Sequence, residues 1–271
     1  MAMASVAEDD LVGGTPLRER PLWRWLYLEP SRTMADMALL PLMQQVLKQA
    51  PEGDGHPVMV LPGFMAGDSS TGAIRRFLTS RGYETHPWEL GRNLGLGTIG
   101  EEGVHLAQRL EDIYDDHGQQ KVSLVGWSLG GVMAREVAKS HGHMVRQVIS
   151  LGSPFAGAPD ASHAWPLYRF LAGDETKSEE FQDVLERMAE APEVPTTSIY
   201  TKTDGVVHWK SSIEKEAHHT DNIEVRSAHC GLGFNAPTFY AVADRLAQPE
   251  DSWRRFHREG WRSLVYPSCG H

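Results

Sequence analysis

Residues 121–131 read KVSLVGWSLGG, and this stretch decides the fold. Its first seven residues have the apolar content of a short strand buried in a sheet. From Leu129 onward, apolar residues fall on one face of a helix. The turn between strand and helix contains Gly126, Ser128 and Gly130, a Gly-x-Ser-x-Gly pattern. The stretch therefore predicts a serine at the tip of a strand-to-helix turn.

Ser128 is the candidate nucleophile because of this turn. A residue at such a position has a strained backbone, and Cβ atoms on its neighbours would collide where strand and helix cross. Glycine at positions 126 and 130 relieves that collision. We expect the Ser128 hydroxyl to point away from the sheet, while the following helix directs its unpaired N–H groups at the same space.

Strand and helix patterns alternate over most of the remaining chain. Strands are expected at 57–61, 83–88, 121–127, 145–151, 196–201 and 223–228, and helices at 68–81, 98–117, 129–141, 178–191 and after the capping residue Asn235. Such alternation predicts an α/β fold, with a mostly parallel central sheet flanked by helices on both faces.

We expect one domain over residues 21–271, preceded by a mobile leader at 1–20. Prolines and aromatic residues interrupt the alternation at 154–195, which predicts a small cap or lid over the sheet edge. Apolar residues at 21–49 predict a helix packed on the domain. The alternative is an amphipathic helix on a membrane surface.

Composition narrows the class of protein. The 271 residues include 26 Lys plus Arg against 36 Asp plus Glu, so the formal net charge is −10, which argues against nucleic-acid binding. Because we find neither a secretory signal nor an apolar run of ~20 residues, we expect a cytoplasmic protein without stable membrane insertion. Cys230 and Cys269 lack metal-site spacing and predict free thiols, with one disulfide as the alternative. We expect no cofactor and no metal, and the oligomeric state is not indicated.

A serine becomes nucleophilic only beside a base that a carboxylate orients. Asp204 and His229 each follow an expected strand, and loops at the carboxyl ends of parallel strands converge. Asp221 precedes its strand and belongs to the opposite edge. The rival histidines are His208, His218 and His219, in a polar stretch that no strand enters, and His141 and His143, at a helix end. With an ordinary pKa, a histidine base loses activity below pH ~6.5.

Two backbone N–H groups are needed to hold the oxyanion. One is expected from Leu129, directly after the candidate nucleophile. The other is expected from the Gly-containing loop after the first strand, with Phe64 as first choice and Met65 as second. Met65, Trp127 and Phe155 are the candidate substrate-binding residues of an apolar acyl pocket.

A second glycine pattern lies at 95–100, where GLGTIG matches the G-x-G-x-x-G dinucleotide fingerprint. In that motif the glycines follow the first strand at once, whereas residues 89–93 intervene here. We therefore interpret this segment as a loop near the edge of the site.

Several segments together resemble the α/β-hydrolase superfamily, especially its bacterial lipases and esterases. They are LPGFMAGDSS at 61–70, VGWSLGG at 125–131, ISLGSPFAG at 149–157, TKTDGVV at 201–207 and SAHCGLGFN at 227–235. The similarity spans roughly 57–248. Trp127 stands where many lipases have histidine, and the loop after the first strand lacks the HGGG form of some esterases.

The resemblance implies Ser128 as nucleophile, Asp204 as acid, His229 as base, and Phe64 and Leu129 as oxyanion donors. It implies a serine hydrolase that cleaves a small-molecule ester or lipid through an acyl-enzyme. Two alternatives stay open: an acyltransferase with the same residues, and a non-catalytic binding protein on the same fold.

Overall fold

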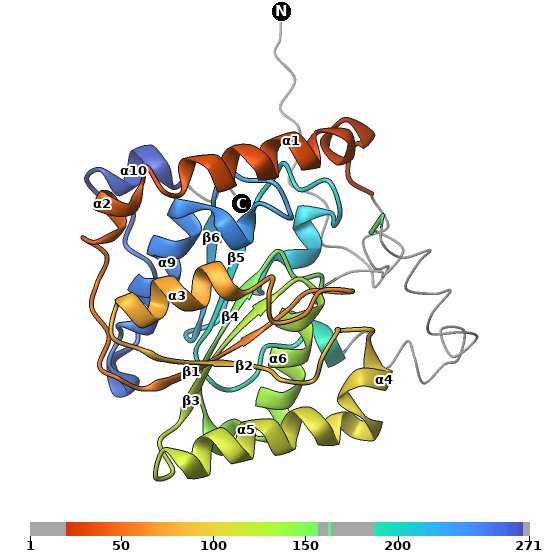
Figure 1. Ribbon diagram of the computed structural model, residues 1–271, viewed down its shortest axis with the longest axis vertical. Coiled ribbons are helices and arrows are strands. Elements are labelled where there is room, and N and C mark those ends of the chain that lie inside the picture. Colours follow the sequence, from red (N-terminus) through yellow and green to blue (C-terminus); the bar gives the residue numbers. More distant parts are fainter. Residues whose placement is uncertain (1–19, 157–161, 164–186, 268–271) are drawn as a thin grey trace, which may run out of the picture.

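A computed structural model describes residues 20–156, 162–163 and 187–267. Six strands form one parallel sheet in the order β2-β1-β3-β4-β5-β6 (Figure 1). The strands are β1 (Pro57–Leu61), β2 (Glu84–Pro87), β3 (Val122–Trp127), β4 (Val145–Leu151), β5 (Thr196–Tyr200) and β6 (Thr220–Glu224). The expected parallel sheet with flanking helices is confirmed.

Helices cover both faces of the sheet. Their bounds are α1 (Trp23–Leu39), α2 (Gln44–Leu47), α3 (Gly72–Ser80), α4 (Leu96–Ile99), α5 (Val104–Asp116), α6 (Leu129–Ser140), α9 (Ala236–Leu246) and α10 (Arg262–Val265). Buried residues of α2, α3 and α9 share one core with Val58 and Val60 of β1, whereas α5 and α6 share the other with Met59 and Leu61. Alternate residues of one strand thus serve opposite cores.

Three expected elements differ from those observed. The helix expected at 68–81 begins at Gly72, after Thr71, and no side chain caps it. The last strand lies at Thr220–Glu224 and not at 223–228, because it begins with polar residues that are nonetheless buried. The helix expected at 98–117 is broken between α4 and α5. Gly100 and Gly103 have positive φ there, of 82° and 77°, which no helix contains.

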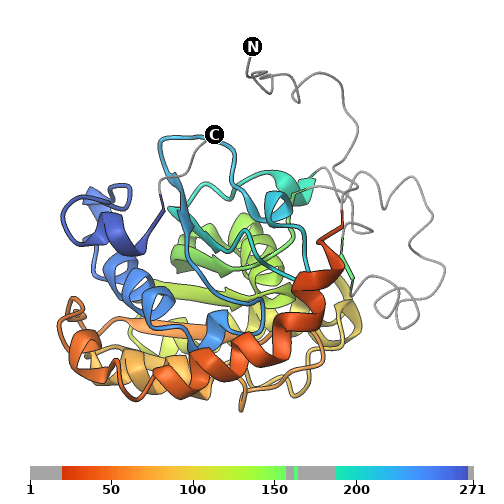
Figure 2. The ribbon, with the colours of Figure 1, turned by 90° about the horizontal axis from the view of Figure 1, so that it is seen from above.

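The helix expected at 21–49 is present as α1 and α2, on the outside of the fold (Figures 1 and 2). The orientation of α1 is unusual, because its apolar side chains face outward. Trp23, Tyr27 and Met34 are 58%, 77% and 69% exposed, whereas Glu29 is 5% exposed. The helix therefore packs on the domain through a charged face.

The leader expected before residue 20 and most of the expected cap lie outside the described residues. Of the cap, Ser162 forms an isolated antiparallel bridge with Val207. Within the described ranges, no helix is both long enough and apolar enough to cross a bilayer.

Candidate active site

Ser128 lies between the end of β3 and the start of α6, in a backbone conformation with φ 53° and ψ −121°. This region is strained for any residue with a Cβ. A Cβ on Gly126 would collide with the backbone of Gly130 and Gly131, and one on Gly130 would lie 2.6 Å from the carbonyl oxygens of Leu61 and Pro62. The steric reason predicted for both glycines is thereby confirmed.

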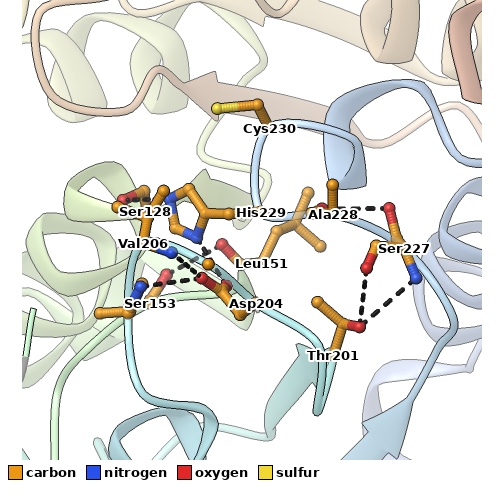
Figure 3. Close-up of polar contacts among 12 residues, drawn as sticks. Ser128, Leu151, Ser153, Thr201, Asp204, Val206, Ser227, Ala228, His229 and Cys230 are labelled. Carbon is orange, nitrogen blue, oxygen red and sulfur yellow. Dashed lines mark hydrogen bonds and ion pairs between the residues drawn. The ribbon is translucent and has the colours of Figure 1, made fainter. Parts of the chain in front are cut away.

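The structure brings Ser128, His229 and Asp204 together at the carboxyl edge of the sheet (Figure 3). Ser128 Oγ lies 3.0 Å from His229 Nε2, and His229 Nδ1 lies 2.7 Å from Asp204 Oδ2. Both distances are those of hydrogen bonds. The imidazole can therefore accept the serine proton at one nitrogen while it donates to the carboxylate from the other.

Asp204 is held by its own loop. Its Oδ1 accepts hydrogen bonds from the backbone N–H groups of Val206 and Val207, each at 2.8 Å. Gly152, just after β4, leaves room for the pair, since a Cβ there would lie 3.3 Å from His229 Nδ1 and 3.4 Å from Asp204 Oδ2. The carboxylate is thus fixed with one oxygen left for the imidazole.

The electrostatics of His229 favour its protonated form. Burial lowers the pKa of the imidazole, but the charge of Asp204, the hydrogen bond to it and the charge of Glu29 outweigh burial, so the pKa is raised above 6.5. A base of raised pKa holds a proton more strongly once it has taken it, and it must be neutral before it can act.

The loop after β1 lies over Ser128. A Cβ on Gly63, the residue before Phe64, would be 3.3 Å from Ser128 Cβ. The N–H of Met65 donates to the carbonyl oxygen of Asn93 at 2.7 Å. Met65, the second choice in this loop, therefore has its N–H engaged within the protein, and Phe64 as oxyanion donor stays a prediction. Leu129 begins α6, where an N–H has no carbonyl partner within the helix.

Asn93 contacts the loop over Ser128, although the sequence analysis did not indicate it. It is fully buried, its N–H donates to Ala66 O at 2.8 Å, and its Nδ2 donates to Pro62 O at 2.9 Å. Together with the Met65 bond, these contacts connect Asn93 to three residues of the loop over Ser128, namely Pro62, Met65 and Ala66. The only sequence signal was its place after β2, beside the glycine pattern.

The three candidate substrate-binding residues have different surroundings. Met65 is 46% exposed, with φ 61°. The indole N–H of Trp127 donates to the carbonyl oxygen of His229 at 3.2 Å. Phe155 is 2% exposed, and its ring centroid lies 3.8 Å from the Arg135 guanidinium carbon. Their contact with substrate stays a prediction, and Met65 has the most open side chain.

Glu29, Arg32 and Asp36 of α1 also escaped the sequence analysis, although all three contact the loops of Asp204 or His229. Glu29 accepts from the N–H of His229, Arg32 donates to Thr203 O at 2.7 Å, and Asp36 accepts from Ser227 Oγ at 2.8 Å. Their spacing of three and four residues, which places all three on one face of a helix rich in large apolar residues, is the signal that could have found them.

A second Ser-His-Asp arrangement lies at the opposite edge of the sheet. His56 Nε2 is 2.8 Å from Ser123 Oγ, and His56 Nδ1 bonds to Asp54. Ser123 and His56 are both fully buried, and Ser123 stands inside β3. Because the Ser123 and His56 side chains are fully buried, a substrate cannot reach this serine, and we interpret the same three residue types as structural here.

One group among the described residues could offer ligand atoms to a metal. Glu84, His86 and His117 bring one atom each within 4.8 Å of one another. His117 Nδ1 also lies 2.7 Å from Ile113 O, and its Nε2 lies 3.2 Å from Glu84. The group stands at the amino end of β2 and therefore takes no part in the site at Ser128.

Comparisons with known proteins agree with this architecture. A family described as alpha/beta hydrolase fold matches residues 82–189. The crystal structure of lipase B from Aspergillus fumigatus superposes with a TM-score of 0.55 at 19% identity, over 72% of this chain and 53% of the lipase. The chain has the α/β-hydrolase fold. The resemblance found in its sequence is confirmed.

Two curated proteins similar to part of this chain have the name of an esterase. The chain is 35% identical over 97 residues to pimeloyl-(acyl-carrier protein) methyl ester esterase of Yersinia enterocolitica, covering 34% of this chain and 36% of that enzyme. It is 30% identical over 145 residues to the esterase of the same name from Citrobacter koseri, covering 50% of this chain and 52% of the enzyme. This α/β-hydrolase-fold chain thus spans about a third to a half of the length of the curated relatives it matches.

Proposed function

We propose that this α/β-hydrolase-fold protein is a serine hydrolase that cleaves carboxylic esters through an acyl-enzyme. The observation that carries the proposal is the distance of 3.0 Å between Ser128 Oγ and His229 Nε2, in a ring whose other nitrogen lies 2.7 Å from Asp204. Support also comes from the two relatives, whose names describe methyl ester hydrolysis.

In the first half of the proposed reaction, Ser128 Oγ attacks the ester carbonyl carbon and His229 Nε2 takes the hydroxyl proton. Asp204 keeps the proton on Nδ1 and stabilises the imidazolium. The imidazolium then passes its proton to the leaving alcohol, and the acyl group stays on Ser128. In the second half, His229 deprotonates a water molecule, which attacks the acyl carbon and releases the acid, and the proton returns to Ser128.

The N–H groups of Leu129 and Phe64 would hold the negative oxygen of the tetrahedral intermediates. Leu129 is the first residue of α6, and Phe64 follows the glycine that lies against Ser128. Such donors act where charge develops, and loss of one costs ~10²–10³ in kcat in comparable sites. The exposed side chain of Met65, next in the loop, is proposed to contact an apolar acyl chain.

Covalent labelling tests the nucleophile. We expect a fluorophosphonate to label the wild type and to leave Ser128→Ala unlabelled. Ser123→Ala is the matched control, because Ser123 belongs to the buried Ser-His-Asp arrangement and should not affect labelling. Equal labelling of the wild type and Ser128→Ala would reject the proposed nucleophile.

A panel of p-nitrophenyl esters of graded acyl length tests the reaction. We expect a burst of p-nitrophenol followed by steady turnover, and free acid as the product. An ester or amide product formed with an added alcohol or amine would indicate an acyltransferase instead. Absence of any burst across the panel, with labelling also absent, would favour the non-catalytic binding protein.

A further inference from the structure

Glu29 of α1 has a buried carboxylate that the proposed reaction does not use. Its Oε1 accepts hydrogen bonds from the N–H groups of Gly205 and His229, at 2.8 and 2.9 Å, and its Oε2 accepts from Cys230 N–H at 3.1 Å. Gly205 belongs to the loop of Asp204, and the other two donors belong to the loop of His229. One carboxylate from the first helix therefore connects both loops.

The backbone of α1 lies directly against the loop of Asp204. A Cβ on Gly205 would lie 2.5 Å from backbone atoms of Trp25 and Leu26. Only glycine allows this approach, because the obstructing atoms are main-chain atoms that cannot rotate away. The close approach brings the Glu29 carboxylate, one turn later in α1, within reach of the Gly205 N–H.

Arg32 and Asp36 continue this contact along the same face of α1. Arg32 donates to the carbonyl oxygens of Thr203 and Ser227, which stand just before Asp204 and His229 in the chain. Asp36 accepts from Ser227 Oγ at 2.8 Å and from Asn235 Nδ2 at 2.9 Å. The two loops therefore form hydrogen bonds with α1 at several points.

The charge of Glu29 acts on the imidazole in the same direction as that of Asp204. Burial lowers the pKa of His229, and the Asp204 carboxylate and then Glu29 raise it by more. Other ionisable groups around these loops include Arg32 and Asp36 of α1, Lys202 and Arg226 of the loops themselves, and Cys230; Lys202 pairs with Glu224 at 2.9 Å. Burial raises the pKa of the Cys230 thiol to about 11, so it carries no charge at neutral pH.

We propose that Glu29 is a positioning residue of the hydrolase, which fixes the loops of Asp204 and His229 together and places a second negative charge behind the imidazolium. This inference rests on the proposed function and extends the site to α1, outside residues 82–189. A glutamine cannot substitute for the carboxylate. It has one acceptor oxygen, and its NH₂ group would face N–H donors.

Glu29→Gln tests the proposal, with Glu52→Gln as the matched control, because the Glu52 side chain is 86% exposed and forms an ion pair with Arg81, away from the loops of Asp204 and His229. We expect kcat of Glu29→Gln on a p-nitrophenyl ester to fall roughly 10- to 100-fold while KM changes little. We expect the acid limb of its pH profile to move to lower pH, since the imidazole loses a negative neighbour. The control should keep the wild-type kcat and pH profile.

Glu29→Asp provides a second variant that retains the charge. Its shorter side chain breaks the contacts with the N–H groups, so kcat should fall while the acid limb stays near that of the wild type. Melting temperatures show whether each variant folds. If Glu29→Gln does not fold, Glu29→Asp and Arg32→Met are tested by the same kcat and pH measurements. Arg32→Met removes hydrogen bonds to the same two loops and leaves the Glu29 carboxylate in place.

NMR titration of the His229 imidazole, identified by its loss in His229→Asn, gives a readout that needs no ester turnover. A lower pKa of His229 in Glu29→Gln, with Glu52→Gln unchanged, supports the inference. A folded Glu29→Gln with the wild-type kcat, pH profile and His229 pKa would overturn it. If the wild type hydrolyses no ester, the proposed function fails, while the NMR comparison still decides whether Glu29 acts on His229.

Discussion

The indole N–H of Trp127 donates a hydrogen bond to the carbonyl oxygen of His229, with 3.2 Å between the two atoms. The residue before the candidate nucleophile therefore supports the backbone of the candidate base. Trp127 also packs edge-on against Phe234, and a Cβ on Gly233 would collide with its ring. A side chain first considered for substrate binding has its polar atom engaged within the site.

Trp127→Phe should keep most of this packing and lose the hydrogen bond. We expect kcat/KM for a p-nitrophenyl ester to fall about 3- to 10-fold, which is the size of effect expected when one neutral hydrogen bond is lost. Trp253→Phe is the control, because the buried Trp253 indole N–H has no hydrogen-bond partner within the part of the chain that the structure describes. Equal activity of the two variants would show that the Trp127 bond does not support His229.

The pH profile should have its acid limb above pH 6.5. Burial lowers the pKa of His229, but Asp204 and Glu29 raise it further, and only the neutral imidazole can accept the Ser128 proton. Activity therefore falls as pH drops through the raised pKa, and not through the ~6.5 that an unperturbed histidine predicts. The measurement is kcat/KM between pH 5 and 9. A constant rate down to pH 5 would contradict His229 as the base.

Gly130→Ala should disrupt the turn at Ser128. The new Cβ would lie 2.6 Å from the carbonyl oxygens of Leu61 and Pro62, which are backbone atoms. We expect a lower melting temperature and at least a roughly 10²-fold loss of ester hydrolysis, because small displacements of reacting groups cost about that much. Gly97 in α4 is the control: a Cβ on this residue would meet nothing within 4 Å, so Gly97→Ala should retain activity and stability. Full activity of Gly130→Ala would refute the steric argument.

Asn93→Ala should loosen the loop that we propose to supply the Phe64 N–H. It removes the bond from Asn93 Nδ2 to Pro62 O, in a fully buried position, and should cost about 1–3 kcal/mol of stability. If the loop stabilises the tetrahedral intermediate as proposed, a boronic acid that mimics this state should bind Asn93→Ala more weakly, with a smaller change in KM. Unchanged boronic acid affinity would argue against a role of this loop in the oxyanion hole.

Features that depend on residues close together in the chain could be predicted from the sequence. The strand over 57–61 and the turn at Ser128 were predicted from apolar runs and glycines, and the structure has them at those positions. Asn235 accepts from Thr238 N–H as the predicted N-cap of α9. Proximity of Ser128, Asp204 and His229 was predictable because parallel topology gathers the carboxyl ends of strands. The cytoplasmic location stays a prediction.

The rest depends on contacts between distant parts of the chain. The polar start of β6 is buried because β5 pairs with it and because Arg245 and Phe256 contact Asp221, and no local pattern encodes these contacts. Glu29 is 200 positions from His229, so its relation to the site appears only once α1 is placed on the fold. The charged inner face of α1 also inverts the usual assumption that apolar residues mark the buried side of a helix.

The attachment of α1 has a consequence for assembly of the molecule. Closing a contact across 200 residues costs chain entropy before any bond compensates for it. The sheet and its two cores contain shorter-range pairings and can form first, whereas the reactive geometry is complete only after the first helix docks onto loops made near the other end. Release of α1, for example by a protease cut between Leu39 and Gln44, would remove the Glu29 contacts with both loops and should abolish the proposed ester hydrolysis, whereas the pairing of the six strands does not involve α1.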